Sequence, residues 1–101
     1  DPEAVACWVA IAAEAIRDPR VKKAFEAALA ETAGFLERLV ADALTKARRP
    51  ARDARAVAAT LLATMQGYFL VSATAPQLIP PGSAAGTTRR LARLLVQGVG
   101  S

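Results

Sequence analysis

The sequence predicts an all-α fold, an antiparallel helical bundle of about four helices whose core is completed across a subunit interface. Apolar residues make up 53% of the 101 residues and aromatic residues only 5%, because most of the excess is alanine. Alanine favours closely packed helices but buries little surface per residue. Apolar residues also recur at spacings of three and four, the period of a helix. A chain of this length can bury one modest core, so residues 1–101 are expected to form one domain.

Two helices are expected in the first half of the chain. Asp1-Pro2 is a start signal for a helix that continues to about Arg17, and Asp18-Pro19 repeats this signal for a helix over about 19–47. The stripes expected to face the core are Val5, Trp8, Val9, Ala12 and Ile16 on the first helix, and Val21, Phe25, Ala28, Thr32, Phe35 and Leu39 on the second, widened by Leu29, Leu36, Val40 and Ala43.

Two more helices are expected in the second half. The basic connection 46–55 contains Pro50 and leads to a third helix over about 53–74. The proline-rich break "APQLIPPGS" then leads to Ser83, the expected N-cap of a last helix over about 84–98. No charged residue lies between Arg55 and Arg89, so the third helix has no charged face beyond its first turn. We therefore expect this helix to be buried on all sides.

The uncharged segment 56–75 also has the length of a membrane span. It contains Gln66, Tyr68, three threonines and one serine, which is a heavy polar load for lipid. The flanking segments read as amphipathic helices of a soluble protein. These observations favour a buried helix and no membrane partner.

Several kinds of chemistry are excluded or disfavoured by composition. The chain has no histidine, and Cys7 is its only cysteine, so zinc-site spacings and histidine-based catalysis are impossible within it. The segment "PPGSAAG" lacks the lysine and the preceding strand of a phosphate-binding loop. We expect no enzyme activity, no metal and no cofactor. A lone cysteine also forms no internal disulfide, which indicates a reducing cytoplasm.

Charge is distributed unevenly along the chain. Residues 1–47 carry a net charge of −2 and residues 48–101 one of +6. A basic half can attract nucleic acid, which leaves sequence-indifferent nucleic-acid binding as one hypothesis. The arginines have no interleaved aromatic residues on which bases could stack. A solvated arginine-rich surface is the favoured interpretation.

The order of the segments resembles the C-terminal domain of TetR-family transcriptional regulators. The resemblance rests on "WVAIAAEAIRDPRV", "AVAATLLATMQGYFL", "APQLIPPGSAA" and "RLARLLVQGVG", and it covers nearly the whole chain. It implies an effector-binding and homodimerisation domain of a cytoplasmic bacterial repressor. Operator DNA would be bound only through an N-terminal helix-turn-helix domain that is absent from this chain. No helix-turn-helix pattern occurs in the sequence itself.

The resemblance also implies positions for two sites. A four-helix dimer interface would form from helices 53–74 and 84–98 of two copies, and its candidate residues are Thr60, Thr64, Gly67, Val71, Leu91, Leu94 and Leu95. A pocket for a small apolar or amphipathic effector would lie among the core helices, and its candidate residues are Trp8, Phe25, Phe35, Met65 and Phe69. These large residues could equally be core fillers. The alternative function is a stand-alone helical dimerisation or adaptor module without a ligand site.

Overall fold

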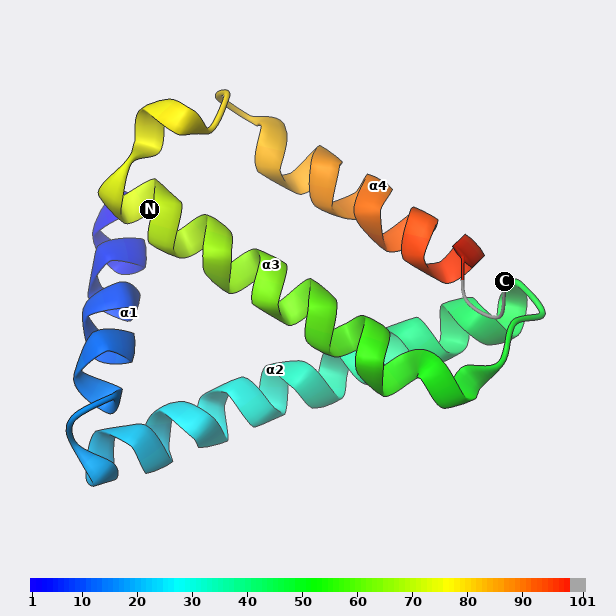
Figure 1. The fold of residues 1–101 in the computed structure, drawn as a ribbon, viewed down its shortest axis with the longest axis horizontal. Helices are drawn as coiled ribbons and strands as arrows, with labels where there is room; N and C mark the ends of the chain where they lie inside the picture. The colour runs from blue at the N-terminus through cyan, green and yellow to red at the C-terminus, as the bar shows by residue number, and fades with distance from the viewer. Residues whose placement is uncertain (99–101) are drawn as a thin grey trace.

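The computed structural model describes residues 1–98 and contains four α-helices with no strand in that range (Figure 1). This confirms the all-α prediction, and the helix boundaries lie within about two residues of those expected. The elements are α1 (Pro2–Ala15), α2 (Pro19–Lys46), the 3₁₀ turn η1 (Ala51–Asp53), α3 (Ala54–Thr74), the 3₁₀ turn η2 (Pro76–Leu78) and α4 (Ser83–Gly98).

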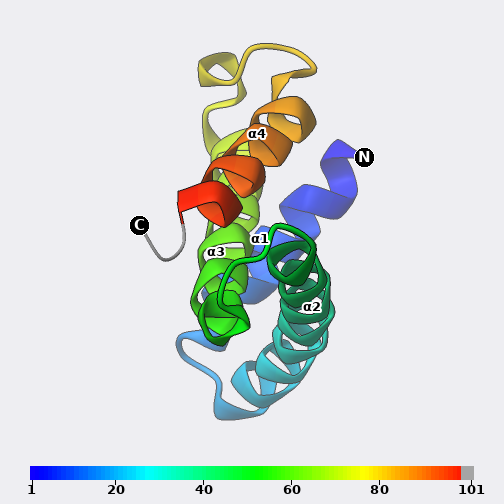
Figure 2. The ribbon, with the colours of Figure 1, turned by 90° about the vertical axis from the view of Figure 1, so that its right-hand side faces the viewer.

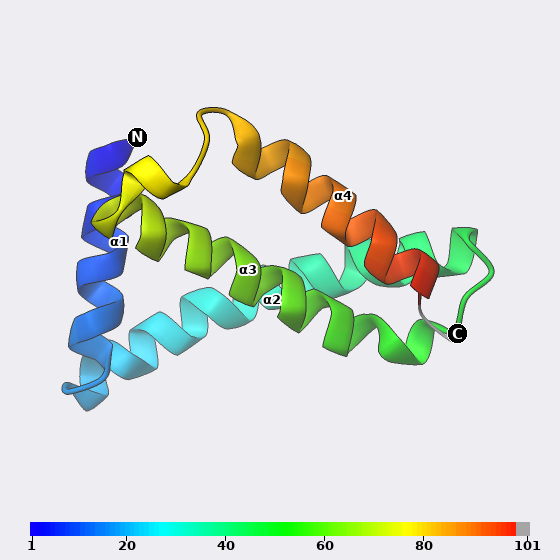
Figure 3. The same ribbon diagram turned by 45° about the horizontal axis from the view of Figure 1, so that its top comes forward.

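The helices form a thin and open arrangement. α2 and α3 make the most extensive contact, and α1 packs across both of them at the end where α2 begins and α3 finishes (Figure 1). α4 returns along α3 and approaches α2 where α2 ends (Figure 3). After a quarter turn, α4 is seen above α3 with α2 at the side (Figure 2). The described chain measures 41 × 34 × 19 Å along its principal axes.

Two aspartates start the first two helices as the sequence indicated. A side-chain oxygen of Asp1 accepts a hydrogen bond from the backbone N–H of Glu3 at 3.0 Å. Asp18 accepts one from the N–H of Arg20 at 2.9 Å. Each aspartate is followed by a proline whose fixed φ suits the first helical turn. The cap at Asp18 fixes the sharp junction between α1 and α2.

α1 ends at Ala15, two residues earlier than expected. The N–H groups of Ile16 and Arg17 bond to the carbonyls of Ala13 and Glu14, three residues back, which tightens the chain before the next helix. Ile16 is consequently 85% exposed, so its placement on the buried stripe was wrong.

The end of α2 is closed by a Schellman motif. Arg48 has a φ of 58°. The N–H of Arg49 bonds to the carbonyl of Leu44 at 2.8 Å, and that of Arg48 bonds to Thr45 at 3.1 Å. This pair of bonds satisfies carbonyls that a helix end leaves free. The chain then reverses through Pro50 and η1 into α3.

The main buried cluster lies at this reversal, and Ala15 of α1 is buried separately from it. Leu44 is fully buried, and it clusters with Val40 of α2 and with Ala54, Val57, Ala58 and Leu61 of α3. Partly buried residues of α4 pack against the same cluster, namely Leu91, Ala92, Leu95 and Val96. The core therefore fixes the C-terminal end of α2, the N-terminal half of α3 and the apolar side of α4.

The stripe expected on α2 is rotated relative to the core. Phe35 and Leu39 are 54% and 52% exposed, so their expected core positions were wrong. The core uses Leu36, Val40 and Leu44 instead, because α3 crosses the neighbouring side of α2.

α3 is not buried on all sides within one chain, which corrects the expectation for this helix. Its buried residues all lie between Ala54 and Leu61. Beyond them, no helix among residues 1–98 covers the outer side of α3, and Leu70 is 51% exposed. By length and composition alone, Ala51–Thr74 could cross a membrane, because an 18-residue window within it has a mean hydropathy of 1.5. Core helices of soluble proteins can have the same length and composition.

The start of α4 also differs in detail from the prediction. Ser83 is the first helical residue and not the N-cap. Its hydroxyl donates to the carbonyl of Pro80 at 2.7 Å. Gly82 precedes it with a φ of +72°, a conformation that glycine adopts without strain. The turn therefore closes backwards onto the proline-rich segment.

Replacing the central core side chain tests this description of the fold. We expect Leu44→Ala to lower the free energy of unfolding by about 2–5 kcal/mol, because truncation leaves a cavity. Leu78→Ala is the control, since Leu78 is 70% exposed, and it should cost less than about 0.5 kcal/mol. Urea unfolding followed by circular dichroism measures both. Equal losses for the two variants would contradict the position of the core.

Candidate functional site

The first candidate site is an apolar groove between α1, α2 and α3, which we call the aromatic groove. Its volume is about 380 Å³. The rings of Trp8 and Phe25 meet there with centroids 4.6 Å apart at an interplanar angle of 32°. The other lining residues are Val9, Ala12, Ala13, Leu29, Gln66 and Leu70, with Ile16 at the edge. The groove can hold a small apolar molecule beside this aromatic pair.

One polar contact fixes the wall of the aromatic groove. The indole Nε1 of Trp8 donates a hydrogen bond of 2.6 Å to Oε1 of Gln66. The two residues lie 58 positions apart in the sequence and the bond is partly buried. It joins α1 to the middle of α3 and satisfies the one polar atom of the indole.

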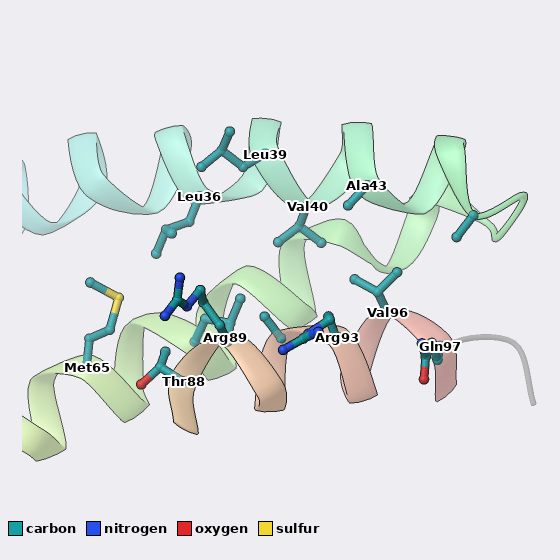
Figure 4. Close-up of a pocket in the computed structure, with 13 residues that line it drawn as sticks. Leu36, Leu39, Val40, Ala43, Met65, Thr88, Arg89, Arg93, Val96 and Gln97 are labelled. Atoms are coloured by element: carbon teal, nitrogen blue, oxygen red, sulfur yellow. The ribbon is translucent and has the colours of Figure 1, made fainter. Parts of the chain in front are cut away.

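The second candidate site is a trough between α2, α3 and α4, which we call the arginine trough (Figure 4). Its volume is about 490 Å³. The walls from α2 and α3 are apolar and consist of Leu36, Leu39, Val40, Ala43, Leu61 and Met65, with Ala47 at one end. The wall from α4 consists of Thr88, Arg89, Ala92, Arg93, Val96 and Gln97.

Two cations therefore border a largely apolar space. Figure 4 shows the side chain of Arg89 directed from α4 into the gap towards α2. Neither Arg89 nor Arg93 forms an ion pair or a side-chain hydrogen bond within residues 1–98. No aspartate or glutamate is among the lining residues. The trough thus combines an apolar wall with uncompensated positive charge.

The five residues predicted for an effector pocket do not converge on one cavity. Trp8 and Phe25 lie together in the aromatic groove, whereas Met65 lines the arginine trough. Phe69 borders a smaller hollow on the other side of Trp8. Phe35 is exposed and lines none of these spaces. The aromatic groove is the place where two predicted residues meet.

Four of the residues predicted for a dimer interface lie on or beside one exposed surface of α3. We call this surface the uncharged α3 face, defined by seven exposed residues at helical spacing: Ala56, Ala59, Thr60, Ala63, Gly67, Leu70 and Thr74. Thr64 and Val71 are half-buried at its edge, where they line a hollow of about 280 Å³ with Tyr68 and Ile79. The structure thus brings Thr60, Thr64, Gly67 and Val71 together.

The leucines of α4 divide between two environments. Leu94 is 60% exposed, so its side chain is free to meet a partner. Leu91 and Leu95 are half-buried and pack against the core cluster of their own chain. Of the three predicted residues, Leu94 is the one that points away from the core.

The hydroxyl groups of the uncharged α3 face are already satisfied. Thr60 donates to the carbonyl of Ala56 at 3.1 Å, and Thr64 donates to Thr60 at 2.8 Å. Thr74 donates to Leu70 at 2.7 Å. Burying this face would therefore leave no threonine hydroxyl without a hydrogen bond.

Sequence reasoning missed two features of these sites. It counted Gln66 among the polar residues of an uncharged segment, but no local pattern pairs it with Trp8 in a distant helix. It read Arg89 and Arg93 as solvated. Their signal was available, because Arg89, Arg93 and Val96 recur at spacings of four and three and so share one side of α4.

A double-mutant cycle tests the bond that positions α1. We expect Gln66→Leu to lower the free energy of unfolding by about 1–3 kcal/mol, since it leaves a partly buried indole N–H unpaired. In a Trp8→Phe background, which lacks the donor, the same change should cost about 1 kcal/mol less. Denaturation followed by circular dichroism measures all four proteins. Identical costs in both backgrounds would contradict the hydrogen bond.

Comparison with known proteins identifies the family. Residues 1–97 match the family described as BetI-type transcriptional repressor, C-terminal. Searches of curated proteins and of solved structures found no significant match. The family match spans nearly the whole chain and agrees with the all-α architecture. The chain therefore belongs to the BetI-type C-terminal domains of TetR-family transcriptional repressors.

Proposed function

We propose that this chain is the effector-sensing and homodimerisation domain of a cytoplasmic bacterial repressor. The family match supports a role in transcriptional regulation. The observation that carries dimerisation is the exposed area, which is 7189 Å². A compact monomer of 10.5 kDa exposes about 5,400 Å², so the excess is about 1,800 Å². A standard interface buries about 800 Å² on each partner, which this excess can supply.

The uncharged α3 face and Leu94 are the proposed contact surface. This face carries no charge from Ala56 to Thr74, so a partner surface can cover it without burying a charged group. Its threonine hydroxyls already form hydrogen bonds and need no further partner. α3 and α4 of two copies would form the four-helix interface. The radius of gyration supports the same conclusion, because it is 15.2 Å against about 13 Å for a compact domain of this length.

Gly67 is the proposed point of closest approach between the two copies. A Cβ atom placed at Gly67 meets no heavy atom within 4 Å in the single chain. Nothing inside one chain therefore requires a glycine there, although glycine in a helix interior costs up to about 1 kcal/mol relative to alanine. The neighbouring hollow beside Tyr68 could receive a side chain from the partner.

The effector is proposed to bind in the aromatic groove as a small uncharged molecule. Leu70 belongs both to this groove and to the uncharged α3 face, and Gln66 is the immediate neighbour of Gly67. A ligand that moves α1 relative to α3 would therefore move the dimer surface as well. The effector shifts the equilibrium only by its different affinity for the two helix arrangements. Operator DNA would respond through the DNA-binding domain of the full repressor.

Filling the proposed contact point tests the interface. We expect Gly67→Leu to weaken the dimer at least tenfold while leaving the helix content unchanged, because the added side chain has free space within one chain. Ala30→Leu, which places the same side chain on the exposed surface of α2, is the matched control. Sedimentation equilibrium over a concentration series measures both dissociation constants. An unchanged dimer in Gly67→Leu would remove this face from the interface.

Blocking the aromatic groove tests the effector site. We expect uncharged apolar compounds in a thermal-shift screen to raise the Tm of the chain, since a ligand that binds only the folded state stabilises it. Ala13→Leu places its side chain at the groove and should abolish the shift. Ala10→Leu, on the exposed surface of the same helix, should retain it.

The same screen distinguishes an effector-sensing domain from an adaptor module without a ligand site. If no compound raises the Tm, or if Ala13→Leu responds like the unchanged chain, the aromatic groove is not an effector site. A dimer that binds no ligand would correspond to the adaptor module.

A further inference from the structure

We propose that the arginine trough is a second ligand site and that it binds an amphipathic anion, an aliphatic chain with a carboxylate or similar head group. This site is separate from the aromatic groove and does not depend on the effector proposed there. The inference rests on charge and shape together, because the trough joins an apolar wall to two arginines that lack acidic partners.

The head group of the ligand is assigned to Arg89 and Arg93. These residues are four positions apart on α4, where two like charges on one side of a helix repel each other. Figure 4 shows Arg89 directed into the gap between α4 and α2. The side chain of Arg93 lies along α4 and is directed towards Arg89. An anion between them would relieve the repulsion and accept hydrogen bonds from both planar guanidinium groups. A cationic or neutral head group would gain neither.

The tail of the ligand is assigned to the α2 wall. From Leu36 to Ala47 the wall runs for about 16 Å, at about 1.5 Å per helical residue. An extended chain of about twelve carbons spans about 14 Å, because each carbon–carbon bond of about 1.5 Å advances the zigzag by about 1.3 Å, so it fits along this wall. The volume of about 490 Å³ lies within the usual size of small-molecule sites. Half-exposed Leu39 would lose its contact with water when the chain binds.

A ligand bound in the trough would also change the contacts that hold α4 in place. α4 packs mainly on α3 and touches α2 only near the end of both helices. A ligand between Leu39 of α2 and Arg89 of α4 would bridge the part of the gap where the helices separate (Figure 4). Because α4 also carries Leu94, which is 60% exposed, the bound anion would act on the position of a residue of the proposed contact surface.

Titration with dodecanoate below its micellar concentration tests the proposal, with isothermal calorimetry of the purified chain as the readout. We expect saturable binding that weakens at least tenfold in the double variant Arg89→Gln/Arg93→Gln. Arg90→Gln removes a neighbouring charge that does not line the trough and should bind as the unchanged chain does. All three arginines are exposed, so the variants keep the fold, which circular dichroism verifies.

Two further probes decide between a specific site and general attraction. Butyrate, which has the head without the tail, and dodecanol, which has the tail without the head, should each bind at least tenfold more weakly than dodecanoate. Absence of dodecanoate binding would overturn the proposal. So would an equal loss in Arg90→Gln, or dodecanol binding as tight as that of dodecanoate.

A last variant separates this site from the aromatic groove. Ala13→Leu should leave dodecanoate binding unchanged, because Ala13 lies in the aromatic groove and not in the trough. Loss of dodecanoate binding in Ala13→Leu would place the anion in the aromatic groove and overturn the second site. Failure of the uncharged effector in the thermal-shift screen leaves this titration unaffected.

Discussion

The packing of the end of α2 against the start of α3 is the contact on which the rest of the fold depends. Among residues 1–98, Leu44 is the one large side chain that is fully buried, and the residues around it come from the two arms of a single chain reversal. The Schellman motif at Arg48 and the break at Pro50 bring these arms together. α4 is held on the same cluster, whereas α1 is held at the far end through Trp8 and Gln66.

Because the main buried cluster lies at one end, α3 carries different surfaces along its length. Its first turns are buried against α2, and its middle joins α1 through Gln66. Its outer side is uncharged and exposed from Ala56 to Thr74. A helix of this kind can connect a groove on one side to a partner on the other, since Leu70 belongs to both surfaces. This arrangement is the physical basis of the coupling that we propose between effector and dimer.

Local signals in the sequence predicted the helices and their junctions well. Asp1 and Asp18 cap as expected, and the proline breaks fall between helices. The side of α2 that faces the core was harder to predict, because Phe35 and Leu39 satisfy the same helical period as Leu36 and Val40. Which of two adjacent stripes is buried depends on where α3 crosses. The Trp8–Gln66 bond joins distant segments, which periodicity does not encode. Periodicity places Arg89 and Arg93 on one side of α4, but it does not show that α2 and α3 complete a trough with them.

The central claim is that the uncharged α3 face is covered by a second copy of the chain. The most direct measurement is the molar mass of the unchanged chain in solution by light scattering at micromolar concentration. The account predicts a mass of twice 10.5 kDa. A stable monomer of 10.5 kDa at that concentration would contradict it, because the exposed apolar surface would then have no partner.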